Sequence, residues 1–170
     1  MKIIGFSNIT GTTTMILKGD SSLLVNRKPF FIPDWSSGIQ ATPCVVLRVS
    51  RLGKNIQAKF AHRYYDAVAY GLNICAADYL AQADTVRAWA FDYSMVVGTF
   101  LDADHDYWRE MDNKMIIPCS EAIRQVSQVM TIRQGDFIFV DYDVPPRTLA
   151  REEIITEYMD NQEILYCKIK

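Results

Sequence analysis

The segment that most constrains the fold is an almost unbroken apolar run, Val68–Cys75, whose one polar side chain is Asn73. Such a run suits a strand that is packed on both faces, so Asn73 is expected to point inward. The residues before it, Gln57–Ala67, place apolar side chains such as Phe60 and Tyr64 at helical spacing. They predict an amphipathic helix that covers a sheet and leads directly into a buried strand.

The composition predicts a single globular domain over residues 1–170. The chain is 49% hydrophobic and 12% aromatic, enough for a sizeable core. Its net charge is -2, with 18 basic and 20 acidic residues spread along the sequence. No basic footprint for nucleic acid and no polybasic membrane patch appears, so neither partner is expected. The N-terminus lacks the apolar run of a signal peptide, and no stretch reaches the roughly 18 apolar residues of a membrane span.

The cysteines are isolated and lie in apolar contexts. No CxxC pair occurs, which removes the spacing argument for zinc or for a thioredoxin-like site. Buried reduced thiols are the simpler interpretation, and they favour a cytoplasmic location. The four residues concerned are Cys44, Cys75, Cys119 and Cys167.

Short strands dominate the remaining pattern, which predicts a mainly β protein with a few helices. One amphipathic helix is expected over Ser120–Met130, with Ser120 as its cap. Residues 78–87 are expected to be helix or loop, 107–110 a strand start or loop, and 151–160 a short helix or strand pair. The expected strands are Lys2–Phe6, Thr12–Lys18, Leu23–Val25, Val45–Ser50, Phe137–Val140 and Glu163–Ile169, and those starting at Val45, Val68, Val96 and Phe137 should form the core.

Four segments, in this order, resemble the fumarylacetoacetate hydrolase family: KPFFIPDW (28–35), GKNIQAKFAHRYYDAVAYGLNICAAD (53–78), AWAFDYSMVVGTF (88–100) and QGDFIF (134–139). The resemblance implies a mixed β-roll. Members of that family hydrolyse, decarboxylate, tautomerise or hydrate acidic 2-oxo or 1,3-dicarbonyl compounds on a divalent metal, usually magnesium.

The family's metal ligands are replaced in this chain. Its Glu-x-Glu pair, which sits on one face of a strand and grips a hard cation, corresponds to Thr42 and Cys44. Its third carboxylate corresponds to Asn73, while the final Asp of the same signature is retained as Asp78. Loss of three carboxylates predicts that Mg²⁺ or Mn²⁺ is no longer bound and that the protein has no cofactor.

Other functional positions of the family also differ. Trp89 occupies the place of a lysine that neutralises substrate charge, and the N-terminal lid helix has no counterpart between Phe6 and the next strand. Lys18 matches a family lysine, but a structural or solvated role suits it at least as well as a substrate contact. The family's oxygen-binding loop corresponds to residues 140–143, where Asp141 and Asp143 would repel an anionic substrate.

Two histidines invite comparison with metal or catalytic sites. His105 stands among alternating carboxylates, Asp102, Asp104 and Asp106, which a polar turn explains more simply than a metal site. His62 lies in the family-like FAHRYYD without a nucleophile beside it, so a structural or surface role is the better interpretation.

These substitutions favour a catalytically silent protein with a binding, scaffolding or subunit-pairing role, as a homodimer or with a related subunit. The alternative is an enzyme acting on a small 2-oxo or 1,3-dicarbonyl acid in the remnant pocket, and a small-molecule ligand also stays open. In a silent protein, Trp89 and Tyr142 should fill that pocket. The candidate pocket residues for an enzyme are Lys18, Asp78, Asp141 and Tyr142, with Cys44 and Asp143 beside them.

Overall fold

The computed structural model describes all 170 residues, and its largest unit of regular structure is one nine-stranded mixed sheet. Its strands follow the order β2-β1-β8-β4-β5-β6-β3, with β7 paired to β5 and β9 to β4. The bounds are β1 Ile3–Ser7, β2 Thr14–Lys18, β3 Leu23–Val25, β4 Ile39–Val49, β5 Tyr65–Ala76, β6 Met95–Val97, β7 Leu101–Asp102, β8 Phe137–Asp141 and β9 Arg147–Thr148.

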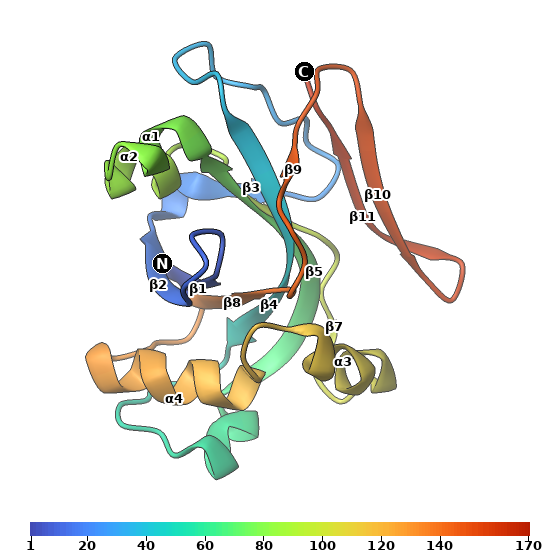
Figure 1. The fold of residues 1–170 in the computed structure, drawn as a ribbon. Coiled ribbons are helices and arrows are strands. Elements are labelled where there is room, and N and C mark those ends of the chain that lie inside the picture. Colours follow the sequence, from blue (N-terminus) through green and yellow to red (C-terminus); the bar gives the residue numbers. More distant parts are fainter.

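A hairpin and several short helices complete the fold (Figure 1). The hairpin consists of β10 (Ile154–Met159) and β11 (Gln162–Lys168). The α-helices are α1 (Ala77–Ala81), α2 (Thr85–Trp89), α3 (Asp106–Met111) and α4 (Cys119–Val129). The 3-10 helices are η1 (Asp20–Ser22), η2 (Ala58–Arg63) and η3 (Asp112–Lys114). None of the helices is long and apolar enough to cross a membrane.

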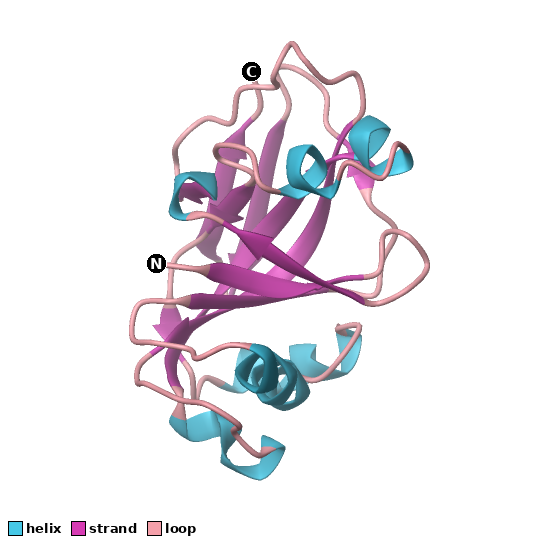
Figure 2. Cartoon of the chain, turned by 90° about the vertical axis from the view of Figure 1, so that its left-hand side faces the viewer, coloured by secondary structure: helices cyan, strands magenta, loops and turns pink.

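The sheet is organised around the long antiparallel pair of β4 and β5, which stays in register from Ile39↔Ala76 to Arg48↔Ala67. The pairs β1–β8 and β3–β6 are parallel, whereas the other pairs of the sheet are antiparallel. The strands curl around each other, with helices on both sides of them (Figure 2). This arrangement confirms the expected mixed, mainly β fold and its four core strands.

Side chains alternate between two faces of this curled sheet. The inner face carries Val46 and Phe139, and these pack with Trp89 of α2 in one buried cluster. The outer face carries Val45 and Leu47, which pack against α4. Farther along the same outer face, Ile39, Leu72 and Ile74 pack against the β10–β11 hairpin.

The structure corrects the helix expected over residues 57–67. Only a 3-10 helix, η2, forms there, and β5 already begins at Tyr65. The apolar spacing was compatible with a helix, but pairing of Tyr65 with Val49 and of Ala67 with Arg48 extends the strand instead. Phe60 is consequently 37% exposed rather than packed on the sheet.

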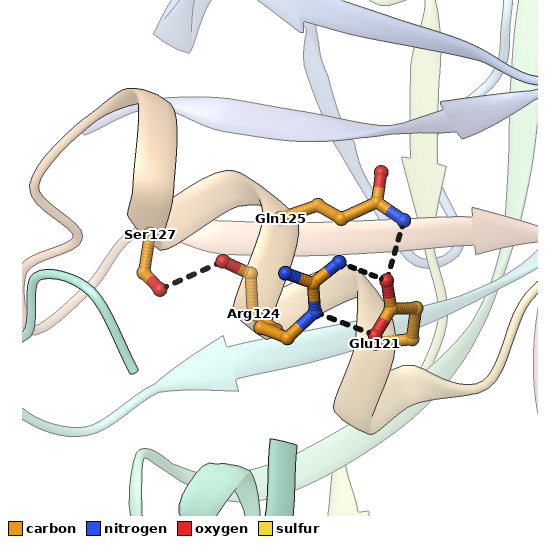
Figure 3. Close-up of polar contacts among 4 residues, drawn as sticks. All are labelled: Glu121, Arg124, Gln125 and Ser127. Carbon is orange, nitrogen blue, oxygen red and sulfur yellow. Dashed lines mark hydrogen bonds and ion pairs between the residues drawn. The ribbon is translucent and has the colours of Figure 1, made fainter. Parts of the chain in front are cut away.

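Helix α4 confirms the amphipathic pattern with a shifted start. Ala122, Ile123 and Val126 are buried as expected, but the N-cap is Pro118 and Val129 is largely exposed. On the polar side, Glu121 accepts hydrogen bonds from Arg124 at 2.5 and 2.7 Å (Figure 3).

Three further hydrogen bonds involve polar side chains of α4. Gln125 Nε2 also donates to Glu121, at 2.8 Å. Ser127 Oγ donates to the Arg124 carbonyl at 3.0 Å (Figure 3). It also accepts from the backbone N–H of Ile56 at 2.9 Å, which ties the helix to the loop before η2.

Candidate functional site

Asn73 and Asp141 meet on the inner face of the sheet. Their strands, β5 and β8, flank β4, where Thr42 pairs with Asn73 and Cys44 with Asp141. Directly paired residues project to the same side, so all four side chains share this face. The Asn73 Nδ2 donates to both Asp141 oxygens at 3.1 Å each, and both residues are buried.

Lys18 enters the same interior from the sheet edge. Strand β2 alternates so that Ile16 and Lys18 both point inward, and Lys18 is only 1% exposed. Its Nζ donates to the Ile74 carbonyl at 2.9 Å and to the Ser94 carbonyl and Oγ at 2.9 and 3.1 Å. The ammonium also lies 5.5 Å from the centroid of the Trp89 ring. Three acceptors therefore use all three of its donors.

Burial shifts the pKa values of these two charged groups in opposite directions. It lowers the pKa of Lys18 to about 7, although the charge of Asp141 acts against this shift. It raises the pKa of Asp141 to about 7, against hydrogen bonds from Ser7 and Asn73 and the charge of Lys18. The positive charge of Lys18 and the negative charge of Asp141 thus partly compensate each other in the low-dielectric interior.

Burial also raises the thiol pKa values on this face. The pKa of Cys44 lies well above its usual range, and that of Cys75 is about 12, where Lys18 partly offsets the effect of burial. Both thiols therefore stay protonated near neutral pH, and neither is poised as a nucleophile or a metal ligand.

None of the five principal cavities is lined by Thr42, Cys44, Asn73 or Asp141. The cavity that comes nearest to this cluster has a volume of about 620 Å³, lies between β2 and α2, and includes Lys18 and Trp89 in its lining. Thr42, Cys44, Asn73 and Asp141 are therefore closed to a ligand in this conformation, whereas Lys18 lies in the wall of this cavity.

The remaining candidate residues do not join this cluster. Asp78 lies in the first turn of α1 and holds the loop before β4, accepting from Ser36 Oγ at 2.7 Å and from the Ser37 N–H at 3.1 Å. Asp143 is exposed and accepts from Asn8 at 3.2 Å.

Tyr142 corrects the expectation that it fills the pocket together with Trp89. It belongs to the outer-face cluster with α4, whereas Trp89 belongs to the inner-face cluster. Its strand neighbour Asp141 points inward, so Tyr142 must point outward. The Tyr142 ring lies 5.8 Å from that of Tyr70, and its buried hydroxyl has no hydrogen-bond partner.

His105 has a structural role. Its Nδ1 accepts from the Tyr107 N–H at 3.3 Å and thereby caps α3, a helix where a strand or loop was expected. No group of three or more His, Cys, Asp or Glu side chains is placed to hold a metal ion, around His105 or elsewhere. His62 is exposed beside a cavity of about 450 Å³ on the outer face.

Solved structures share this architecture over nearly the whole chain. A protein from Yersinia pestis CO92 that is assigned to the fumarylacetoacetate hydrolase family matches with a TM-score of 0.87 and 15% identity, covering 99% of this chain and 92% of that one. A 5-carboxymethyl-2-hydroxymuconate delta-isomerase from Mycobacterium smegmatis matches with a TM-score of 0.82 and 14% identity, covering 99% and 78%. A 2-hydroxyhepta-2,4-diene-1,7-dioate isomerase from Mycobacterium marinum matches with a TM-score of 0.83 and 16% identity, covering 99% and 73%.

The chain has the fold of the fumarylacetoacetate hydrolase family. The resemblance in its sequence is thus confirmed at the level of the fold. No protein-family model and no curated protein matches the sequence. At such low identity the chemistry has to be argued from the site itself.

The inner face of this fumarylacetoacetate hydrolase fold does not suit a hard dication. Magnesium requires about six oxygen ligands, most of them anionic or water. Thr42, Cys44 and Asn73 supply no carboxylate, and Asp141 already accepts from Asn73. The Asn73 Oδ1 is the one oxygen here that is buried without a partner. The buried Lys18 amine, whose pKa is about 7, acts on Asp141 with its positive charge when it is protonated, which also disfavours a cation there.

The positive charge near Trp89 comes from Lys18 of β2, and the sequence analysis did not predict this contact. The family lysine is absent at position 89, yet the Lys18 ammonium lies beside the indole. Strand alternation could have found this, because it puts Lys18 on the side of the apolar Ile16. Ser7 and Ser94, which bond to Asp141 and Lys18, carried no signal in the sequence.

Proposed function

We propose that this chain is a non-catalytic protein with the fumarylacetoacetate hydrolase fold, which binds no divalent metal and works by pairing with another protein subunit. The observation that carries the proposal is the closed inner cluster, in which Lys18, Asn73 and Asp141 are buried and bonded within the protein. Such a cluster has a structural use of its own, because each charged group has a partner.

The lack of free hydrogen-bond donors for a substrate at the inner face supports the same proposal. A 2-oxo acid would need open donors at the inner face, but the three Lys18 donors already bond to Ile74 and Ser94. Binding it there would break buried hydrogen bonds, each of which is costly to leave unmade. A protein that keeps the fold while closing the site is suited to association rather than turnover.

An enzyme acting on a 2-oxo or 1,3-dicarbonyl acid is the second candidate, and one observation favours it. Strongly shifted pKa values cluster at functional sites, and Lys18 and Asp141 both have a pKa of about 7. A conformational opening at the cavity between β2 and α2 would expose Lys18 for proton transfer.

Calorimetric titration of metal-stripped protein with Mg²⁺ and Mn²⁺, followed by a turnover screen with 2-oxo and 1,3-dicarbonyl acids, tests both. We expect no saturable heat and no turnover. Saturable metal binding, or turnover that Asp141→Asn abolishes and the exposed Asp143→Asn retains, would establish the enzyme instead. These matched variants separate the inner carboxylate from its neighbour on the surface.

A single domain that works in the cytoplasm is part of the proposal. The four cysteines are all free, and three of them are buried. Reduced thiols in a chain of this kind are typical of a reducing compartment. Location of a tagged full-length chain by cell fractionation tests this part.

A further inference from the structure

A second group of polar residues gathers on the outer face of the sheet. It surrounds a cavity of about 450 Å³, a volume within the usual range of small-molecule sites. Strands β4 and β5 supply an apolar floor with Val45, Leu47 and Val68, and residues of α3, η3 and α4 supply the walls. Val45 and Leu47 alternate with Cys44 and Val46 of the inner face, so the sheet itself separates this cavity from the inner cluster.

Trp108 of α3 brings an uncommitted donor to this cavity. The residue lines the cavity and is only 7% exposed. Its indole N–H is buried and has no hydrogen-bond partner. Because a buried donor that stays unpaired is costly, the site favours a ligand that carries an acceptor.

The start of α4 brings a second free donor. The N–H of Cys119 donates to Asp112 Oδ1 at 3.2 Å, and those of Glu121 and Ala122 donate to the Pro118 carbonyl at 3.0 Å. The N–H of Ser120, which lies between them and lines the cavity, has no such partner. The first N–H groups of a helix need partners from outside the helix, and a ligand oxygen can serve as one.

The cavity also offers acceptors, because Asp104 and Asp112 belong to its lining. Arg109, which lines the cavity too, pairs with Asp106 at 3.1 Å rather than with Asp104. Burial raises the pKa of Tyr65 to about 12, and nearby negative charges, those of Asp112 and Asp104 among them, add to this shift. The two carboxylates therefore act on the interior of the cavity.

We propose that this outer-face cavity binds a neutral, polyhydroxylated molecule of monosaccharide size, whose hydroxyl groups bond to Trp108, Ser120 and Asp104. A hydroxyl both donates and accepts, so a ligand of this class can pair with the indole N–H, the backbone N–H and a carboxylate together. The aromatic rings of Tyr65 and Trp108 provide apolar contact for the C–H face of a sugar ring.

Charged ligands suit the cavity less well. An anion would meet the carboxylates of Asp104 and Asp112. An organic cation would leave the buried indole N–H of Trp108 without an acceptor. The proposed binding does not depend on subunit pairing or on any activity of the inner face.

Indole N–H signals in ¹H–¹⁵N correlation spectra of the full chain test the proposal. The chain has three tryptophans, and Trp108→Phe identifies the signal that belongs to the cavity. D-glucose, D-ribose and myo-inositol are titrated one at a time. We expect at least one of them to shift the Trp108 signal saturably and to leave those of Trp35 and Trp89 in place. No saturable shift with any of the three, or equal shifts of all three indoles, would overturn the proposal.

D-glucuronate and D-glucosamine decide the class of ligand. We expect neither to saturate the Trp108 signal at a lower concentration than the best neutral probe does. Tighter binding of glucuronate would indicate an anion site at the start of α4, and tighter binding of glucosamine an amine site at the carboxylates. Either result contradicts a neutral ligand.

Two variants test the contacts by saturation-transfer NMR on the best neutral probe. Trp108→Phe keeps an aromatic ring but removes the donor, and it should raise the dissociation constant about tenfold or more. Asp104→Ala alters an exposed side chain that the fold does not need, and the loss of one acceptor should raise the constant about threefold or more. Asp102→Ala, at an exposed carboxylate outside the lining, is the control and should bind like the wild type. Unchanged affinity in Asp104→Ala, or in a folded Trp108→Phe, contradicts the proposed site.

Discussion

The side-chain amide of Asn73 donates to both carboxylate oxygens of Asp141 across an intervening strand. Asn73 belongs to β5 and Asp141 to β8, and both strands pair with β4. This contact therefore spans three strands of the sheet on its inner face. A carboxylate that is fully buried needs such partners, because an unpaired charge in the interior is very costly.

Asp141→Asn should destabilise the protein by about 3–5 kcal/mol. Removal of the carboxylate places two amide groups face to face and leaves the buried Lys18 ammonium without its compensating charge. Loss of one partner of a buried charged pair is strongly destabilising because the other charge stays buried and uncompensated. Urea unfolding followed by tryptophan fluorescence measures the change. Asp143→Asn, at an exposed carboxylate two residues away, should stay within about 0.5 kcal/mol of the wild type. Equal free energies of unfolding for the two variants would contradict a structural role of Asp141.

Lys18 and Asp141 should be coupled in a double-mutant cycle. Lys18→Met alone strips three buried acceptors of their donor, whereas Lys18→Met with Asp141→Asn removes both charges. We expect the double variant to be more stable than the sum of the single effects, by about 1–3 kcal/mol. Additive effects would mean that the two charges do not compensate each other.

The pH dependence of stability should carry the signature of this pair. The pKa of Asp141 rises from 3.8 to about 7 on folding, so its contribution to stability is complete below pH 3.8 and is lost as pH rises through 7. The pKa of Lys18 falls from 10.5 to about 7, so its contribution is complete above pH 10.5 and is lost as pH falls through 7. Together the two groups produce a minimum in stability near pH 7.

The difference in unfolding free energy between wild type and the double variant isolates this minimum. Each group changes stability by at most about 1.4 kcal/mol per pH unit. Chemical denaturation between pH 4 and about 8.5 keeps the buried thiols Cys44 and Cys75, which face the pair, protonated. A difference curve that is flat across this range would contradict the opposed pKa shifts of Lys18 and Asp141.

Strand positions were predictable because alternation and apolar runs report burial directly. The run Val68–Cys75 marked β5, and its one polar residue, Asn73, does point inward. The same rule applied to β2 and β8 would have placed Lys18 with Ile16 and Asp141 with Phe139 on the inner face. The charge of Lys18 and Asp141 masks this alternation in the sequence, because charged side chains are usually solvated.

The helical regions show where local pattern gives way to tertiary pairing. The apolar spacing in residues 57–67 fits a helix. However, β4 extends to Val49, and the residues from Tyr65 onward pair with it as part of β5. Helix α3 was missed because its cap is His105, which is not among the preferred capping residues.

The C-terminal hairpin could have been decided from its turn. The sequence of residues 151–160 is compatible with a short helix or a strand pair, and the structure has β10 followed by β11. Between them, Asp160 and Asn161 both adopt positive φ angles, 48° and 66°. Aspartate and asparagine tolerate this conformation, and two such residues between strands indicate a tight hairpin.

Gly5→Ala should be among the most damaging small substitutions in the chain. Gly5 of β1 pairs with Phe139 of β8, and a Cβ at position 5 would lie 2.3 Å from both the ring and the carbonyl oxygen of Phe139. Because the parallel pair of β1 and β8 lies in the middle of the sheet, neither strand can move away without disturbing its other neighbour. We expect a loss of about 3 kcal/mol or more, at the upper end of overpacking effects.

The matched control for this substitution is Gly19→Ala. Gly19 has φ -77°, which alanine adopts without strain, and the one atom near its would-be Cβ is Ser21 Oγ at 4.0 Å. This variant should unfold within about 0.5 kcal/mol of the wild type. If both glycine variants unfold at the same urea concentration as the wild type, β1 and β8 do not approach each other as closely at Phe139 as the structure has it. Loss of stability in Gly5→Ala alone supports the parallel register of β1 and β8 at Phe139.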